Sequence, residues 1–294
     1  MKGIVLAAGK GTRLYPMTKP VCKPLLPVYD KPLIYYSLDV LMNAGIRDIL
    51  IIIPPGEEDT FKRLLGDGSH LGISISYEVQ HVARGIADAF IVGEEFIGDD
   101  DVCLILGDNI FYQEGFDLML KAVQGSNEGA TVFGYYVDDP RAFGVVEFDS
   151  DGKAVSIEEK PENPKSNYII PGLYFYDNSV VDIAKNLKPS SRGELEITDV
   201  NIEYMNRGLL KVIPLDKDFI WLDAGTADSL LEAGNTIQKM QESDRYVAYI
   251  EETALKNGFI DKNEYFALGE AMKNTKYGQY ILGLDTRSIN TADV

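Results

Sequence analysis

The feature of this 294-residue chain that most limits its fold is the regular alternation of two hydrophobic patterns through its first third. Runs typical of strands occupy Lys2–Ala7, Asp48–Ile53, Ile73–Glu78 and Val102–Leu106. Patterns with helical spacing lie between them, at Pro32–Ala44, Glu57–Leu65 and Gly85–Phe96. Strands that alternate with helices of this length predict βαβ units, and therefore a parallel sheet with helices on both faces.

The rest of the chain changes character twice. Gly144–Phe148 and Ala154–Glu159 flank the turn sequence DSDG, and Ile169–Tyr176 reads as a further strand, which predicts a β extension over one edge of the site. Helical patterns follow at Ala227–Gln241, Tyr246–Lys256 and Lys262–Lys273. We therefore predict an α/β fold with a Rossmann-like, mixed but mainly parallel sheet. It has a main domain over residues 1–235 and a helical C-terminal region over 236–294.

Composition excludes several classes of function. The formal net charge of -18 disfavours nucleic acid or an anionic membrane as partner. Apolar runs such as Ile49–Ile53 are far shorter than the roughly 20 residues of a membrane span. Cys22 and Cys103 predict reduced thiols in a cytoplasmic protein. The chain has only two histidines, His70 and His81, which argues against a zinc site or a Ser-His-Asp triad.

The stretch Leu6–Leu14, LAAGKGTRL, places glycines directly after the first predicted strand. Glycines there allow the backbone to approach a phosphate closely. A dinucleotide fingerprint needs a third glycine where Leu14 stands, which disfavours a nicotinamide oxidoreductase. A P-loop needs Ser or Thr where Gly11 follows Gly9-Lys10. Residues 1–31 also hold six lysines and arginines against a single acid, so they suit a small polyanion. An ordinary turn with a solvated basic face is the alternative.

Three further residues are placed to act on a phosphate or its metal ion. Lys23 lies in KPVCKPLLPV, whose prolines favour a stiff, extended segment. Asp108 and Asp223 each follow a short apolar strand. Because carboxyl ends of parallel strands share one edge of a sheet, Asp108 and the glycine loop can face one crevice. Two such carboxylates can bind one Mg²⁺ ion. The alternatives are a connector lysine and aspartates that cap a turn or helix.

The predicted β extension ends in a charged cluster. Glu158, Glu159 and Lys160 close the strand, and alternation sends the two glutamates to opposite faces, so only one can face the site. Gly172 in the next strand permits close approach of a ligand. A solvated Glu–Lys pair is the alternative.

These pieces, in this order, resemble the sugar-nucleotide pyrophosphorylases, most of all the members that use dTTP. The resemblance runs from residue 1 to about 235, and the tail is similar to the helical C-terminal region of short members. The stretches that carry it are LAAGKGTRLYPMTKPVCKPLLPVYDKPLIYY, ARGIADAFIVGEEFIGDD, LILGDNIFY, FGVVEF, EEKPENPKSNY, GLYFYD, PSSRGELEITDVN and WLDAGTADSLLEAG.

The resemblance implies that glucose 1-phosphate attacks the α-phosphorus of dTTP in line, giving dTDP-glucose and pyrophosphate with Mg²⁺. This is the first step of dTDP-deoxysugar biosynthesis, for example of dTDP-rhamnose for polysaccharides. It also implies a homotetramer and feedback inhibition by a dTDP-sugar through the C-terminal region. The alternatives are a UTP-dependent or broad-specificity enzyme, and a non-catalytic sugar-nucleotide sensor that would lack a catalytic lysine or metal aspartate.

The resemblance also assigns residues. The expected catalytic residues are Arg13, Lys23, Asp108 and Lys160. The expected nucleotide-binding residues are Ala8, Gly9, Gly11, Thr12, Arg13, Gln80, Gly85 and Asp108. The expected sugar-phosphate residues are Asn109, Gly144, Glu159, Lys160, Gly172, Tyr174 and Arg192. Asp108 and Asp223 are expected to bind Mg²⁺. Departures from the usual family pattern, which bear on substrate preference, occur at Ala8, Pro24, Phe143 and His81–Arg84.

Overall fold

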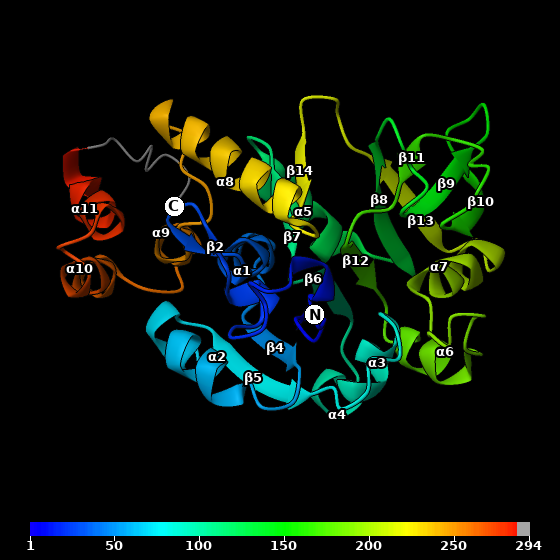
Figure 1. The fold of residues 1–294 in the computed structure, drawn as a ribbon, viewed down its shortest axis with the longest axis horizontal. Helices are drawn as coiled ribbons and strands as arrows, with labels where there is room; N and C mark the ends of the chain where they lie inside the picture. Colours follow the sequence, from blue (N-terminus) through cyan, green and yellow to red (C-terminus); the bar gives the residue numbers. More distant parts are fainter. Residues whose placement is uncertain (287–294) are drawn as a thin grey trace.

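A ten-stranded mixed sheet forms the centre of the molecule in a computed structural model, which describes residues 1–286 (Figure 1). Its strands are β1 (Lys2–Leu6), β4 (Asp48–Ile53), β5 (Ser74–Val79), β6 (Val102–Leu106), β8 (Ala130–Tyr136), β9 (Gly144–Phe148), β10 (Ala154–Glu159), β11 (Tyr168–Ile169), β12 (Leu173–Tyr176) and β13 (Leu210–Pro214). Their order is β10-β9-β11-β8-β12-β6-β1-β4-β5, and β13 pairs with β8. The predicted α/β class and mixed sheet are confirmed, but the expectation that the sheet is mainly parallel is wrong, because antiparallel pairs join β12, β8, β11, β9 and β10.

Parallel pairing is concentrated in one half of the sheet. β6, β1, β4 and β5 are parallel neighbours, as the βαβ pattern predicted. β12 runs antiparallel between β6 and β8, and the β9–β10 hairpin with β11 continues the antiparallel half. β9 and β10 are antiparallel because a tight turn joins them, whereas parallel neighbours need a crossover, as β13 has beside β8.

Helices cover both faces of the sheet, because its central strands are apolar on both sides. On β4, Ile49, Ile51 and Ile53 belong to one core, whereas Leu50 and Ile52 belong to the other. The first core is covered by α1 (Ile34–Asn43), α2 (Glu58–Leu65), α5 (Phe116–Ser126) and α9 (Ile250–Lys256). The second core is covered by α3 (Asp88–Val92), α4 (Glu94–Ile97), α6 (Val180–Asn186) and α7 (Ile197–Asn206).

Two predicted elements are broken in the structure. The helix expected over Gly85–Phe96 begins only at Asp88 and divides at Gly93 into α3 and α4. Gly85 has a φ of +102°, a conformation that no helix adopts. The strand expected over Ile169–Tyr176 divides into β11 and β12, and Pro171, which lacks a backbone N–H, lies in the gap.

Short elements link the sheet to the C-terminal helices. The hairpin β2 (Pro27–Val28) and β3 (Lys31–Pro32) lies under α8 (Ala227–Glu242), and β7 (Asn109–Tyr112) pairs with β14 (Ile220–Asp223). α10 (Lys262–Ala271) and α11 (Lys276–Leu282) lie at one end of the molecule (Figure 1). The boundary expected at residue 235 falls inside α8.

Helix α9 packs on α1, so the C-terminal region shares the first core of the main domain. Within residues 1–286, no helix has both the length and the apolar character needed to cross a bilayer.

Candidate active site

One cavity of about 690 Å³ lies along the carboxyl ends of β1 and β6 and the β extension. Most of the residues expected at the site line it, namely Ala8, Gly9, Arg13, Gln80, Gly85, Asp108, Asn109, Gly144, Glu159, Lys160, Gly172, Tyr174, Arg192 and Asp223. Gly11, Thr12 and Lys23 are not among the lining residues, although all three are close neighbours of residues that are.

The glycine-rich loop forms the first wall of the cavity. Gly11 has a φ of +58°, and a Cβ there would lie 3.0 Å from Thr18 Cγ2 and 3.2 Å from Lys23 Cβ. Only glycine meets both demands without strain. Thr18 Oγ1 donates a hydrogen bond to the Gly11 carbonyl at 2.6 Å, which fixes the turn. The turn exposes Gly9 and brings Arg13 to the cavity.

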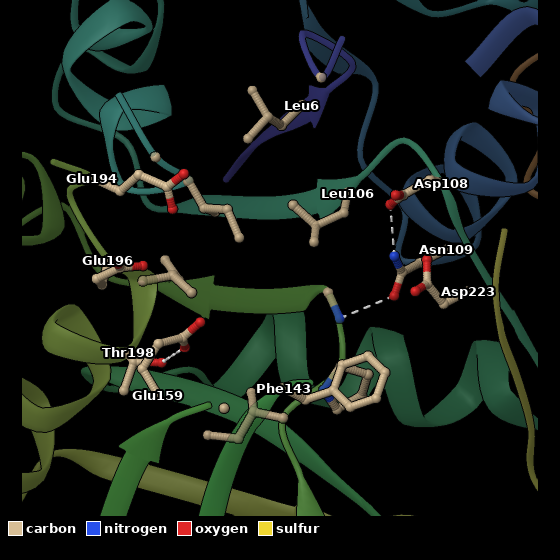
Figure 2. Close-up of a pocket in the computed structure, with 18 of the residues that line it drawn as sticks. Leu6, Leu106, Asp108, Asn109, Phe143, Glu159, Glu194, Glu196, Thr198 and Asp223 are labelled. Carbon is tan, nitrogen blue, oxygen red and sulfur yellow. Dashed lines mark hydrogen bonds between the residues drawn. The ribbon is translucent and has the colours of Figure 1, made fainter. Parts of the chain in front are cut away.

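Asp108 and Asp223 meet at one side of the cavity (Figure 2). β14 pairs with β7 so that Asp223 lies opposite Asn109, and the Ala224 N–H donates to the Asp108 carbonyl at 3.1 Å. Burial, and then the charge of Asp108, raise the pKa of Asp223 to about 6, against the opposing charges of Lys23 and Arg13. The fold therefore holds two carboxylates together at a cost that a cation would relieve.

The neighbours of this acid pair are ordered by hydrogen bonds. Lys23 is 8% exposed, and its Nζ contacts Asp108 Oδ2. Asn109 Nδ2 donates to Asp108 Oδ1 at 2.8 Å. Asn109 Oδ1 in turn accepts from Trp221 Nε1 at 2.7 Å and from the Gly172 N–H at 3.2 Å. Lys23 thus reaches the site through Asp108, which it partly neutralises.

Neither aspartate acts as the cap that was its alternative. The N-cap of α8 is Thr226, whose side chain accepts from the Ser229 N–H while the Ser229 hydroxyl accepts from the Thr226 N–H. Asp223 lies outside that capping box. Asp108 is followed by β7 and not by a helix, and its carboxylate contacts Lys23 and Asn109.

A charged network forms the opposite side of the cavity (Figure 2). Arg192 Nη2 lies 3.1 Å from Glu159 Oε1 and 2.7 Å from Glu196 Oε2. Thr198 Oγ1 donates to Glu159 Oε2 at 2.5 Å, and Lys160 Nζ lies 3.6 Å from Glu159 Oε1. Glu159 is therefore held by three partners.

Only one of the two glutamates faces the cavity, as the alternation along the strand predicted. Glu159 lines the cavity, whereas Glu158 pairs with Lys165 at 2.6 Å outside it. Gly172, which was expected to permit close approach of a ligand, also has a role in packing. A Cβ at Gly172 would lie 2.6 Å from Leu106 Cγ, so the close neighbour of this glycine is the Leu106 side chain. The glycine is needed for packing of the chain against β6, although it also lines the cavity.

Sequence reasoning missed several lining residues, among them Glu196, Thr198 and Trp221. Trp221 is the only tryptophan of the chain and precedes Asp223 by two positions, which was a usable signal. It packs edge to face with Phe143, with ring centroids 5.4 Å apart. Thr198 carried no signal, because only the position of α7 brings its hydroxyl to Glu159.

The chain belongs to the nucleotidyl transferase family, whose sequence model matches residues 2–240. The cavity combines a glycine loop that carries Arg13, paired aspartates, and a cluster in which Lys160 and Arg192 lie among glutamates.

Among its relatives are two enzymes named glucose-1-phosphate thymidylyltransferase. The one from Neisseria meningitidis is 56% identical over 285 residues, which cover 97% of this chain and 99% of the relative. The one from Mycobacterium tuberculosis is 51% identical over 289 residues, 98% and 100% of the two chains. A solved structure from Bacillus anthracis, assigned as a glucose-1-phosphate thymidylyltransferase and determined with a sucrose, superposes with a TM-score of 0.74. It is 44% identical and covers 80% of this chain and 94% of that one.

Proposed function

We propose that this chain transfers a thymidylyl group from dTTP to α-D-glucose 1-phosphate, giving dTDP-glucose and pyrophosphate. The observation that carries the proposal is a single cavity whose two sides each present cations, Arg13 on one and Lys160 with Arg192 on the other. Two phosphorylated substrates need such an arrangement. The names of the relatives, which share about half of this sequence over nearly its whole length, support the choice of substrates.

The reaction needs positioning and charge more than it needs a nucleophilic side chain. A phosphate oxygen of glucose 1-phosphate attacks the α-phosphorus of dTTP, and the bond to the departing pyrophosphate breaks as the new one forms. Both substrates are anions, so repulsion is the main obstacle. Arg13 and Lys23 oppose the charge of the triphosphate, and Lys160 and Arg192 that of the sugar phosphate. Neither cysteine lines the cavity, which is consistent with direct transfer.

Asp108 and Asp223 are the proposed Mg²⁺ ligands. The raised pKa of Asp223 supports this role, because burial and then the charge of Asp108 disfavour its ionised form, and a bound cation would oppose both effects. Within residues 1–286 no group of three His, Cys, Asp or Glu side chains could hold a metal. Two carboxylates fit Mg²⁺, which usually keeps several waters and substrate phosphate oxygens as ligands. When bound, the ion supplies charge neutralisation on the phosphates.

The remaining residues divide between the two substrates. We propose that the loop from Ala8 to Arg13 binds the triphosphate, and that Gln80 and Gly85 contact the base. On the sugar side, Glu159 accepts from sugar hydroxyls, and Lys160 and Arg192 bind the phosphate. Asn109, Gly144, Gly172 and Tyr174 complete that wall, and all four line the cavity.

The test is pyrophosphate release measured over a matrix of nucleoside triphosphates and sugar 1-phosphates. We expect the highest kcat/KM for dTTP with glucose 1-phosphate and no turnover without a divalent ion. A clear preference for UTP would replace the proposal by the UTP-dependent alternative. Nucleotide binding without turnover of any pair would favour the non-catalytic sensor.

We also propose a regulatory role for the C-terminal helices, with a dTDP-sugar such as dTDP-rhamnose as inhibitor. A second cavity of about 250 Å³ between α1, α5 and α9 supports it. Inhibition that is strictly competitive with dTTP, with one nucleotide bound per chain, would contradict a second site. The two buried, free cysteines support a cytoplasmic location for the enzyme.

A further inference from the structure

Gln80, the residue proposed to read the base, is itself held by a buried carboxylate. Gln80 directly follows β5, lines the cavity and is 7% exposed. Its Nε2 donates a hydrogen bond of 2.8 Å to Oδ2 of Asp88, the first residue of α3, which is 1% exposed. The other oxygen of Asp88, Oδ1, lies 2.8 Å from Arg84 Nη2. The side chains of Gln80, Asp88 and Arg84 therefore form a chain of contacts that runs from the cavity to the surface.

This contact fixes which end of the Gln80 amide faces Asp88. An ionised carboxylate only accepts hydrogen bonds, whereas an amide has a donor end and an acceptor end. Rotation of the amide by half a turn would place Oε1 against Oδ2, and two buried acceptors would then face each other without a proton. Arg84 Nη2 lies against the other oxygen of the same carboxylate, so each oxygen of Asp88 faces a nitrogen that carries hydrogens.

We propose that Asp88 is a positioning residue that sets base preference through Gln80. With Nε2 held toward Asp88, Gln80 offers the cavity Oε1 as acceptor and the second N–H of Nε2 as donor. That pair complements a pyrimidine with a protonated ring nitrogen beside a carbonyl, as in uracil and thymine. Cytosine presents the reverse pattern, a bare ring nitrogen beside an amino group, and would need the rotated amide. The inference rests on the proposed function only in taking Gln80 as the base-reading residue.

Two features of the site support a role in recognition over a role in packing alone. The loop that carries Arg84 and Gly85 is tied to the chain before α7 by hydrogen bonds from Leu195 N to Arg84 O (2.6 Å) and from Ala87 N to Leu195 O (3.2 Å). A Cβ at Gly85 would lie 2.4 Å from the Leu195 carbonyl oxygen, so this wall is close-packed. The loop is therefore held by backbone hydrogen bonds that do not involve Asp88. The Asp88 carboxylate instead accepts the hydrogen bond that orients Gln80.

The experiment compares dUTP with dCTP, because these two lack the methyl group of dTTP and differ only in the edge that Gln80 reads. We expect the wild-type enzyme to prefer dUTP by about 100-fold or more in kcat/KM with glucose 1-phosphate. Asp88→Asn keeps the shape but can donate as well as accept, so both amide orientations become possible. We expect it to lower the dUTP/dCTP ratio by about 10-fold or more. Asp88→Ser, which also donates and accepts, should change the ratio in the same direction.

Glu95→Gln is the matched control, because it removes an exposed carboxylate from the neighbouring helix α4. Its ratio should stay within about twofold of wild type. A purely structural role of Asp88 would lower turnover of both nucleotides equally and leave the ratio unchanged, which would overturn the inference. If the wild-type enzyme has the same kcat/KM for dCTP as for dUTP, the inference is overturned without any variant.

The two proposals can fail separately. Absence of turnover with dTTP and glucose 1-phosphate would reject the proposed function, and the dUTP/dCTP ratio would then be measured as a ratio of equilibrium dissociation constants. A change in that binding ratio in Asp88→Asn supports the inference, and an unchanged ratio contradicts it.

Discussion

Asp223 is a residue whose ionised form costs the fold free energy. It is buried beside Asp108, and its raised pKa means that between about pH 4 and 6 the folded chain holds a proton that the unfolded chain would release. Such a cost is typical of a functional site, where charge is held ready for a ligand. On the other side of the cavity, Thr198 has the opposite role, because its hydroxyl stabilises the carboxylate of Glu159.

We expect Asp223→Asn to lower kcat at saturating Mg²⁺ by about 100-fold or more, because one of two proposed metal ligands is lost. Without metal, the Asp223→Asn variant should be at least as stable as the wild type at pH 7, since the substitution removes the buried charge of Asp223. Steady-state kinetics and thermal unfolding measure the two effects. Unchanged turnover would contradict the metal assignment.

Thr198→Val should raise the KM for glucose 1-phosphate by about 10-fold, because Glu159 loses a hydrogen bond that orients it. The KM for dTTP should change little, since Thr198 contacts Glu159 on the side of the cavity proposed to bind the sugar. Thr198→Ser keeps the hydroxyl and serves as the control. An equal rise of both KM values would show that the substitution disturbs the site as a whole.

Among the helices, α8 and α9 show how local contacts fix the elements around the site. The capping box of Thr226 and Ser229 determines where α8 begins, four residues after Asp223. Helix α9 is docked on α1, where Thr253 Oγ1 donates to the carboxylate of Asp39. One contact is made at a helix end and the other between helices, so they can be tested independently.

Loss of the cap in Thr226→Ala should lower the free energy of unfolding by about 1 kcal/mol, because an N–H at the start of α8 loses its acceptor. Urea denaturation measures this change. Thr226→Ser retains the oxygen and should remain within a few tenths of a kcal/mol of wild type. An equal loss in both variants would mean that the methyl group, and not the cap, is responsible.

The contact between α1 and α9 should make stability depend on pH. Burial is the main cause that raises the pKa of Asp39 to about 6, and the hydrogen bond from Thr253 opposes it. Between its ordinary pKa of about 4 and 6 the folded state binds more protons than the unfolded state, so stability falls as pH rises through this window.

Asp39→Asn should flatten this dependence and stabilise the protein at pH 7 by up to about 3 kcal/mol, since a shift of one pKa unit corresponds to about 1.4 kcal/mol. Thermal unfolding from pH 4 to 8 measures both effects. A wild-type stability that rises from pH 4 to 6 in step with that of the variant would contradict the assignment.

For the molecule as a whole, the two cores and the C-terminal helices form a continuous body around the sheet (Figure 1). Large apolar side chains remain exposed on it, including Leu118 on α5 and Leu231 on α8, which are 68% and 65% exposed. Exposed apolar side chains of this size are compatible with contacts between copies, although single ones also occur on monomers.

We expect sedimentation equilibrium to give four times the chain mass of 32.6 kDa, as the family resemblance implies. The mass should persist at 0.5 M salt, because apolar contacts are not screened. A mass of one chain at micromolar concentration would contradict the homotetramer.

Much of the fold followed from the sequence because its signals are local. β4, β6, β9 and β10 have the bounds that their apolar runs predicted, since period-two patterns, turn residues and prolines act within a few positions. The predicted elements were wrong where contacts with distant parts of the chain determine the local backbone. Gly85 takes a conformation set by contact with Leu195, and the division of the strand before Leu173 accompanies the packing of Gly172 on Leu106.

The sequence by itself determined the βαβ half of the sheet, the glycine loop and the two strand-end aspartates, because residue type and spacing carry that information. Only the tertiary structure decided which side chains meet. Lys23 contacts Asp108 across 85 positions, Thr198 reaches Glu159 across 39, and Asp88 holds Gln80 from a neighbouring helix. Such pairs depend on how strands and helices pack over the whole chain, and no local pattern encodes that packing.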